Sequence, residues 1–258
     1  MVPPGALPAA RRRAALLSTF FSALAYPFRG VGYFLGRPGL WKYFAAAFAI
    51  NVVLFGVLTW LFVHYRTDLV DWILPARWWG WVRTGLGWLI TAAVAIAGLF
   101  LFTIIGHILA SPFLDAMTER ILRDLGEPLP PPRGPWRALL RGLVNQLLKL
   151  LIFGAVQIAL LFLHLIPGIG SVLHAVLSSF AGVVFLGFEY LDYPLDARGL
   201  SVPGRFAWLA RHLESSLGFG AVLFPVLLIP FVGYVLLPLS VAGACLLAHR
   251  IDSPGPNG

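Results

Sequence analysis

Leu165-Ile166-Pro167-Gly168-Ile169-Gly170 sets the architecture of this chain, and a close copy follows at Leu228-Ile229-Pro230-Phe231-Val232-Gly233. Each copy lies between two long apolar runs and follows a short basic segment. Proline removes a backbone donor and glycine permits a sharp turn, so Ile-Pro-x-x-Gly between apolar arms predicts a helical hairpin. We predict two such hairpins, at residues 150–187 and 217–248.

The composition indicates that lipid is the solvent for most of the chain. Of its 258 residues, 59% are hydrophobic and only 12% are charged, and the mean hydropathy is +0.84. A soluble domain carries about 25% charged residues. The net charge of +8 is spread among apolar runs, which suits anionic lipid headgroups or an anionic solute rather than nucleic acid. We therefore predict an all-α integral membrane protein that contacts membrane lipids.

Two segments are long enough to cross a bilayer as helices, residues 41–63 and 86–109, and the loop 64–84 between them is rich in tryptophan. The first arms of the hairpins, 150–165 and 217–229, fall short of the roughly 20 residues that a crossing needs. They either penetrate only partway or cross where the bilayer thins. Their buried turns need protein partners for the backbone, which favours a homo-oligomer.

The other segments complete a single membrane domain over residues 14–250. We predict a disordered basic tail at 1–13, an interfacial helix at 14–28, an amphipathic helix at 113–125, a polar, turn-rich connection at 188–200, and a disordered tail at 251–258.

Charge distribution predicts the topology. Of the 19 lysines and arginines, only Arg66, Arg77 and Arg83 lie in the loop 64–84. Positively charged loops stay in the cytoplasm, so both termini are expected there.

A glycine-rich segment ahead of the first span is the candidate anion site. Gly30, Gly32, Arg29 and Arg37 lie in a stretch that also holds two further glycines and a proline. We predict a turn whose backbone N–H groups, with the two arginines, bind an anion. The alternative is a positively charged interface turn that only fixes orientation.

Ionisable residues near the hairpins are candidates for a pore or gate. Glu189 and Asp192 could pair with cytoplasmic arginines at a pore mouth, or belong to a loop held by turn and capping bonds. His164 and His174 could contact solute, or be neutral and hydrogen-bonded between helices. The sequence has no catalytic motif, so we expect no enzymatic activity, no metal and no cofactor.

Six short motifs occur in a familiar order over roughly residues 28–250. They are Arg37-Pro38-Gly39-Leu40-Trp41-Lys42-Tyr43, Ser111-Pro112-Phe113-Leu114-Asp115, Leu165-Ile166-Pro167-Gly168-Ile169-Gly170, Glu189-Tyr190-Leu191-Asp192-Tyr193-Pro194, Gly218-Phe219-Gly220 and Pro238-Leu239-Ser240-Val241-Ala242-Gly243-Ala244. With them the chain resembles the CysZ family of sulfate permeases, the bacterial branch of the etoposide-induced 2.4-like membrane proteins.

The resemblance implies two long spans, two partially inserted hairpins and an oligomer that admits sulfate for cysteine biosynthesis. It also implies a sulfate site made of a glycine, an apolar residue and a basic residue in succession. Here these positions are Gly30, Val31 and Gly32, so the basic residue is missing, and Arg29 and Arg37 flank the gap. Because arginine binds tetrahedral oxyanions through a fork of donors, its loss is expected to weaken the site.

Two functions follow as hypotheses. The first is an inner-membrane permease or channel for sulfate or a related oxyanion, with Arg29, Gly30, Val31, Gly32 and Arg37 as the anion site. The second is a membrane scaffold or lipid-interacting protein that moves no solute, favoured by the interfacial helices and the glycine at position 32.

Overall fold

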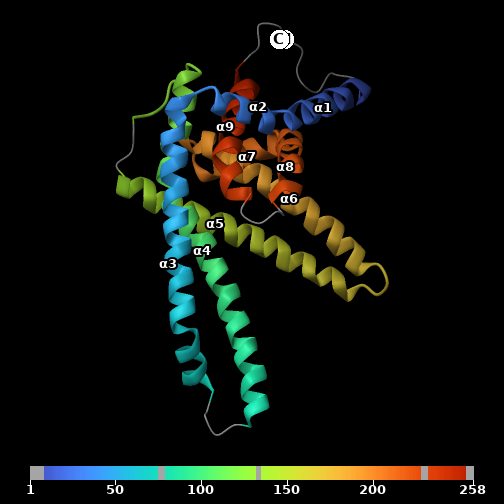
Figure 1. The fold of residues 1–258 in the computed structure, drawn as a ribbon. Helices are drawn as coiled ribbons and strands as arrows, with labels where there is room; N and C mark the ends of the chain where they lie inside the picture. Colours follow the sequence, from blue (N-terminus) through green and yellow to red (C-terminus); the bar gives the residue numbers. More distant parts are fainter. Residues whose placement is uncertain (1–8, 75–78, 132–134, 228–231, 254–258) are drawn as a thin grey trace. The chain divides into compact units, whose positions relative to one another are not determined.

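The computed structural model describes residues 9–74, 79–131, 135–227 and 232–253. All regular structure in these ranges is helical. The helices are α1 (Ala9–Leu24), α2 (Tyr26–Leu35), α3 (Pro38–Ile73), α4 (Gly80–Asp124), α5 (Pro135–Leu161), the 3-10 turn η1 (Phe162–Leu165), α6 (Gly170–Ala197), α7 (Val202–Arg211), α8 (Leu213–Leu227) and α9 (Val232–Asp252) (Figure 1). The prediction of an all-α protein is confirmed.

The chain divides into two compact units. Residues 1–44 and 114–258 form the first unit, and residues 45–113 form the second. Of the predicted tails, residues 1–8 and 254–258 lie outside the described residues, whereas residues 9–13 belong to α1.

The core of the first unit lies where α6, α8 and α9 meet. α1 packs on α8, α2 packs on α9, and α6 packs on both α8 and α9. Leu191, Phe219, Val241 and Cys245 are fully buried there. The α6–α8 crossing is close because glycine lies on both sides of it: a Cβ at Gly187 would meet the carbonyl of Ser216.

The first hairpin has the tip that its sequence predicts. η1 ends at Leu165, a turn follows at Pro167 and Gly168, and the φ of Gly168 is +82°, a conformation that favours glycine. The arms are longer than predicted, since α5 already begins at Pro135 and the apolar helical stretch covers Leu140–Leu165. The second tip, residues 228–231, lies outside the described residues.

Two segments predicted as turns are helical. Residues 188–197 continue α6, so the turn-rich connection shrinks to the three residues before Ser201. Residues 29–35 lie in α2, so the glycine-rich turn predicted there is wrong. Packing within the first unit explains why residues 29–35 are helical, because α2 continues almost directly from α1 and packs its glycine face on α9.

The second unit consists of the facing parts of α3 and α4. Both helices extend beyond the predicted spans, α3 to Ile73 and α4 from Gly80, so most of the predicted loop 64–84 is helical. The amphipathic helix predicted at 113–125 is likewise the continuation of α4 through Pro112.

Four helical stretches are long and apolar enough to cross a membrane, namely Pro38–Ile73, Gly80–Asp124, Leu140–Leu165 and Gly170–Ala197. Their large apolar side chains are largely exposed, for example Leu151 at 70%, Phe100 at 67% and Val172 at 65%. Exposed apolar faces of this size belong in lipid or against another subunit. The division into two long spans and two short hairpins stays a prediction.

Candidate functional site

The two arginines of the predicted anion site are exposed and rest on tyrosine rings. The guanidinium carbon of Arg29 lies 4.9 Å from the ring centre of Tyr26, and that of Arg37 lies 3.5 Å from the ring centre of Tyr33. Among the residues that the structure describes, neither arginine has a carboxylate partner. A tyrosine ring contacts the flat face of a guanidinium. The N–H donors at the edge of the guanidinium therefore stay available to an anion.

The remaining residues of this candidate site divide into buried and exposed positions. Gly30 is buried, Val31 is half-buried and Gly32 is exposed with open space around its α-carbon. Inside a helix each backbone N–H is bonded to the carbonyl four residues earlier. The backbone donors of these three residues are thus used within α2, and anion contacts at this segment fall to the arginine side chains.

Gly30 marks a close helix crossing rather than an open turn. A Cβ at this position would lie 2.5 Å from both the carbonyl oxygen of Leu239 and the α-carbon of Gly243. The reverse holds for Gly243, where a Cβ would lie 2.5 Å from the carbonyl oxygen of Tyr26. The two glycines therefore bring the backbones of α2 and α9 together.

Glu189 and Asp192 lie at the base of the first hairpin and are ion-paired there. Nζ of Lys149, on α5, lies 2.8 Å from Glu189 and 3.3 Å from Asp192. Asp192 also accepts a 2.7 Å hydrogen bond from Arg205 of α7. The side chain of Arg205 is only 2% exposed, so these charges are largely withdrawn from solvent.

Asp196 completes this cluster, which we call the hairpin-base cluster. Its Oδ1 lies 3.1 Å from Arg141 and 3.3 Å from Arg205. The cluster joins three cations to three carboxylates: Lys149, Arg141 and Arg205 with Glu189, Asp192 and Asp196. A balanced set of this kind avoids the cost of an uncompensated buried charge.

The histidines of the hairpin come together at its opposite end. The rings of His164 and His174 lie 4.4 Å apart at the tip, and each ring has a backbone carbonyl near its Nδ1, at 3.3 Å for Leu161 and 3.1 Å for Leu160. The hairpin therefore separates two predicted sets, with Glu189 and Asp192 at its base and the histidines at its tip.

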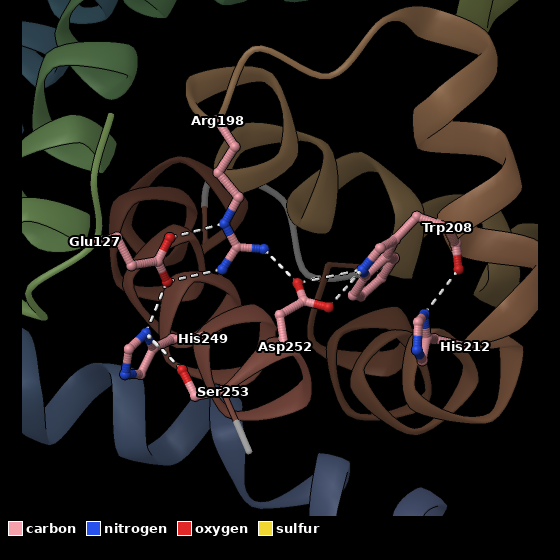
Figure 2. Close-up of polar contacts among 7 residues, drawn as sticks. All are labelled: Glu127, Arg198, Trp208, His212, His249, Asp252 and Ser253. Carbon is pink, nitrogen blue, oxygen red and sulfur yellow. Dashed lines mark hydrogen bonds and ion pairs between the residues drawn. The ribbon is translucent and has the colours of Figure 1, made fainter. Parts of the chain in front are cut away.

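A second polar cluster joins the ends of several elements (Figure 2). Arg198, directly after α6, donates two 2.8 Å hydrogen bonds to Glu127 and a 2.6 Å bond to Asp252 near the end of α9. His249 lies 2.7 Å from Glu127, and Trp208 of α7 donates to Asp252 at 3.2 Å. These contacts fix the end of α9 against α7 and against the segment that follows α4.

The cluster shifts the pKa of its central groups. Burial raises the pKa of Glu127, but the hydrogen bonds from Arg198 and His249 outweigh burial and hold that pKa below its usual value. Burial lowers the pKa of Arg198, while Glu127 and Asp252 raise it by more.

Sequence reasoning did not identify Glu127, Arg198 and Arg205 as partners. Each lies in a short polar interval between apolar helices, and a charge in such a place needs a partner when the chain folds. That signal predicts pairing but not the partner, because the contacts join residues that are far apart in the sequence.

We expect Glu127→Gln to destabilise the protein at pH 7 by about 2 kcal/mol, the range of hydrogen bonds to charged groups. A carboxyl whose pKa is lowered by folding stabilises the fold above its unfolded-state pKa and loses that effect as the pH falls through its folded-state pKa. The gap between wild type and variant should thus close in acid. Thermal unfolding in detergent from pH 7 to pH 3 measures it.

Glu119→Gln is the matched control, since Glu119 pairs with Arg123 one turn away on the exposed face of α4. Such pairs contribute about 0.5 kcal/mol or less. A gap for Glu127→Gln that stays constant across the pH range would contradict the role of the Glu127 carboxylate.

These features define a helical membrane protein, with apolar helices exposed along their lengths and paired charges at their ends. The chain belongs to the family described as Sulfate transporter CysZ/Etoposide-induced protein 2.4, whose model matches residues 26–238. This confirms the resemblance drawn from the six motifs.

Curated relatives match across most of the chain. A protein named Sulfate transporter CysZ from Pseudomonas fluorescens strain Pf0-1 is 32% identical over 219 residues, which cover 83% of this chain and 87% of the relative. One of the same name from strain Pf-5 is 33% identical, with 83% and 88% covered. Another from Pectobacterium atrosepticum is 29% identical over 234 residues, with 84% and 83% covered.

Proposed function

We propose that this chain is a permease for sulfate, or a closely related oxyanion, in the bacterial inner membrane, where it supplies sulfur assimilation. The family supports sulfate transport as the general role. The observation that carries the proposal for this chain is a pair of exposed arginines, Arg29 on α2 and Arg37 just after α2, that have aromatic support and no carboxylate partner in the described residues. The other proposed features are cytoplasmic termini and a homo-oligomer.

The contrast with the buried cations of the first unit supports this choice of site. Lys149, Arg198 and Arg205 are neutralised by carboxylates, so an entering dianion would have to displace an internal partner to bind them. Arg29 and Arg37 need no such exchange. Guanidinium donors form charge-assisted hydrogen bonds with oxyanions, which are roughly twice as strong as neutral ones.

Gly32 is the position at which the site can be strengthened. It lies three residues after Arg29, on the same face of the helix, and no heavy atom would lie within 4 Å of a Cβ there. An arginine at position 32 thus has room and would add its donors between those of Arg29 and Arg37. In this proposal Gly30 and Val31 support α2. Gly30 packs closely on α9, and Val31 is the apolar residue of the motif.

Glu189 and Asp192 are proposed to line the mouth of the path at the hairpin base, and His164 and His174 to line it at the tip. The supporting observation is that the first hairpin carries polar groups at both ends. In this proposal the ion pairs at the base break and re-form as sulfate passes, and they do not bind sulfate permanently.

Labelled sulfate uptake in a host that lacks its own sulfate uptake systems tests the proposal. We expect uptake above the vector control, a roughly tenfold decrease with Arg29→Gln/Arg37→Gln, and an increase with Gly32→Arg. Arg250→Gln, which removes a positive charge at the end of α9, is the control for net charge and should leave uptake unchanged.

Absence of uptake with protein confirmed in the membrane would contradict the proposal that the chain is a permease. Selective co-purification of a protein partner would then favour the scaffold.

A further inference from the structure

The second unit holds a groove that the proposed transport does not use. Within residues 45–113 an aromatic contact and an ion pair join α3 to α4: Phe55 meets Phe102, with ring centres 5.5 Å apart, and Asp71 pairs with Arg83 at 2.5 Å. Between these contacts lies a groove of about 440 Å³, lined chiefly by Leu58, Phe62, Leu69, Val94, Gly98 and Leu99. Its lining is almost wholly apolar.

A polar pocket of about 430 Å³ adjoins the groove. Its lining includes Arg66, Thr67, Asp71, Arg83, Thr84 and Trp88. Arg66 lines both cavities and so stands at their junction. The two cavities together form one site with a long apolar part and a charged head.

The charged head has donors that the fold leaves unused. Arg66 has no ion pair with any described residue, and Nε of Arg83 is buried without a hydrogen-bond partner. The hydroxyl of Thr84, in contrast, already donates a hydrogen bond to the backbone carbonyl of Gly80. A buried N–H without a partner is costly, so a ligand oxygen that accepts from these guanidinium groups would be stabilised.

The same head also offers an acceptor. Asp71 accepts from Arg83 through Oδ1, yet its side chain is 63% exposed. The pocket thus presents two cations and one carboxylate, which matches a headgroup that carries both a phosphate and an ammonium. A headgroup with only negative charge would be repelled by the exposed Asp71 carboxylate and would have no group to place beside it.

The aromatic residues around the pocket place it at the level of lipid headgroups. Five tryptophans near this end of α3 and α4 are between 60% and 83% exposed: Trp60, Trp72, Trp79, Trp81 and Trp88. Exposed tryptophans of membrane proteins gather at the membrane–water interface. From Phe55 to Leu69 the groove extends about 21 Å along the helix, which exceeds the ~15 Å hydrocarbon depth of one leaflet.

We infer that this site binds a phosphatidylethanolamine molecule, with one acyl chain in the groove, the phosphate at Arg66 and Arg83, and the ammonium at Asp71. A second copy of the chain is the other possible occupant of the groove. An apolar helix would cover the leucines and phenylalanines, but it would bury Arg66 without an acceptor and would still leave the buried Nε of Arg83 without one, which is unfavourable.

Native mass spectrometry of the full chain, released from nanodiscs that contain equal amounts of phosphatidylethanolamine and phosphatidylglycerol, tests the inference. We expect one phosphatidylethanolamine per chain to be retained preferentially. Arg66→Gln should weaken its binding about tenfold, and Asp71→Asn should remove the preference between the two lipids.

Gly98→Leu tests the groove itself. No atom lies within 4 Å of a Cβ at Gly98, so leucine fits the fold and occupies the space of the acyl chain. Gly56→Leu is the matched control, because Gly56 is equally open but does not line the groove. Lipid loss is expected only for Gly98→Leu.

Three results would overturn the inference. They are unchanged lipid retention in Gly98→Leu, equal retention of both lipids by the wild type, and a change of oligomeric state in Gly98→Leu, which would assign the groove to a second copy. Free phosphoethanolamine is included as a competitor. Displacement of the lipid by it at equal concentration would show that the acyl chain contributes nothing.

Discussion

Replacing Arg205 with methionine is expected to reduce the free energy of unfolding by about 3–5 kcal/mol, the cost of removing one partner from a buried ion pair. The guanidinium is 2% exposed and lies 2.7 Å from Asp192 and 3.3 Å from Asp196. Methionine fills much of the same volume but leaves the hairpin-base cluster with three carboxylates and two cations. Thermal unfolding in detergent measures the loss.

A second substitution separates the charge from the packing. Arg205→Met/Asp192→Asn restores equal numbers of cations and carboxylates, with Lys149 still paired to Glu189 and Arg141 to Asp196. We expect it to recover most of the stability. If the double variant is as unstable as the single variant, the destabilisation comes from the lost packing of Arg205 rather than from unbalanced charge.

Arg211 provides the matched control on the same helix. It is exposed, and its Nε donates to a backbone carbonyl of its own helix, that of Ala207. Exposed substitutions away from special features change stability by about 0.5 kcal/mol or less. A loss for Arg211→Met as large as that for Arg205→Met would mean that any change in α7 unfolds the protein.

The arrangement of elements was predictable where sequence signals are local. Pro167 and Gly168 specify a turn whatever packs around them, and the structure has that turn. Long apolar runs predict helices in lipid, because a helix satisfies the backbone hydrogen bonds of such a run within the run itself.

Helix ends were less predictable, because polar residues can extend a helix when tertiary partners neutralise them. Glu189, Asp192 and Asp196 look like a polar connection in the sequence. In the structure they continue α6, since Lys149, Arg141 and Arg205 pair with them. The pairing depends on contacts between α5, α6 and α7 that no local pattern encodes.

The glycine-rich segment before the first span shows the same limitation. Four glycines in a short stretch are typical of a turn, because glycine weakens an isolated helix by about 1 kcal/mol per residue. α2 forms regardless, because Gly30 allows close packing on α9 and that packing supports the helix. Glycine here indicates a close approach of two backbones.

Gly30→Ala is therefore expected to destabilise the protein by about 3 kcal/mol, the upper range for overpacking a tight contact. Its Cβ would meet backbone atoms of Leu239 and Gly243, which cannot move aside as a flexible side chain can. Gly32→Ala is the matched comparison two residues later in the same helix. Nothing lies within 4 Å of its Cβ, so alanine should stabilise α2 by up to about 1 kcal/mol.

The opposite signs of these two substitutions distinguish packing from anion binding within one motif. Thermal unfolding without sulfate should show a loss of stability for Gly30→Ala and none for Gly32→Ala.

Gly243→Ala places a methyl group against the carbonyl of Tyr26 and separates the same pair of helices. Combined with Gly30→Ala it should cost less than the sum of the single variants, because both substitutions disrupt the same contact between α2 and α9. Full additivity would place the effects of Gly30 and Gly243 in different contacts, and equal stability of the Gly30 and Gly32 variants would contradict the close α2–α9 crossing.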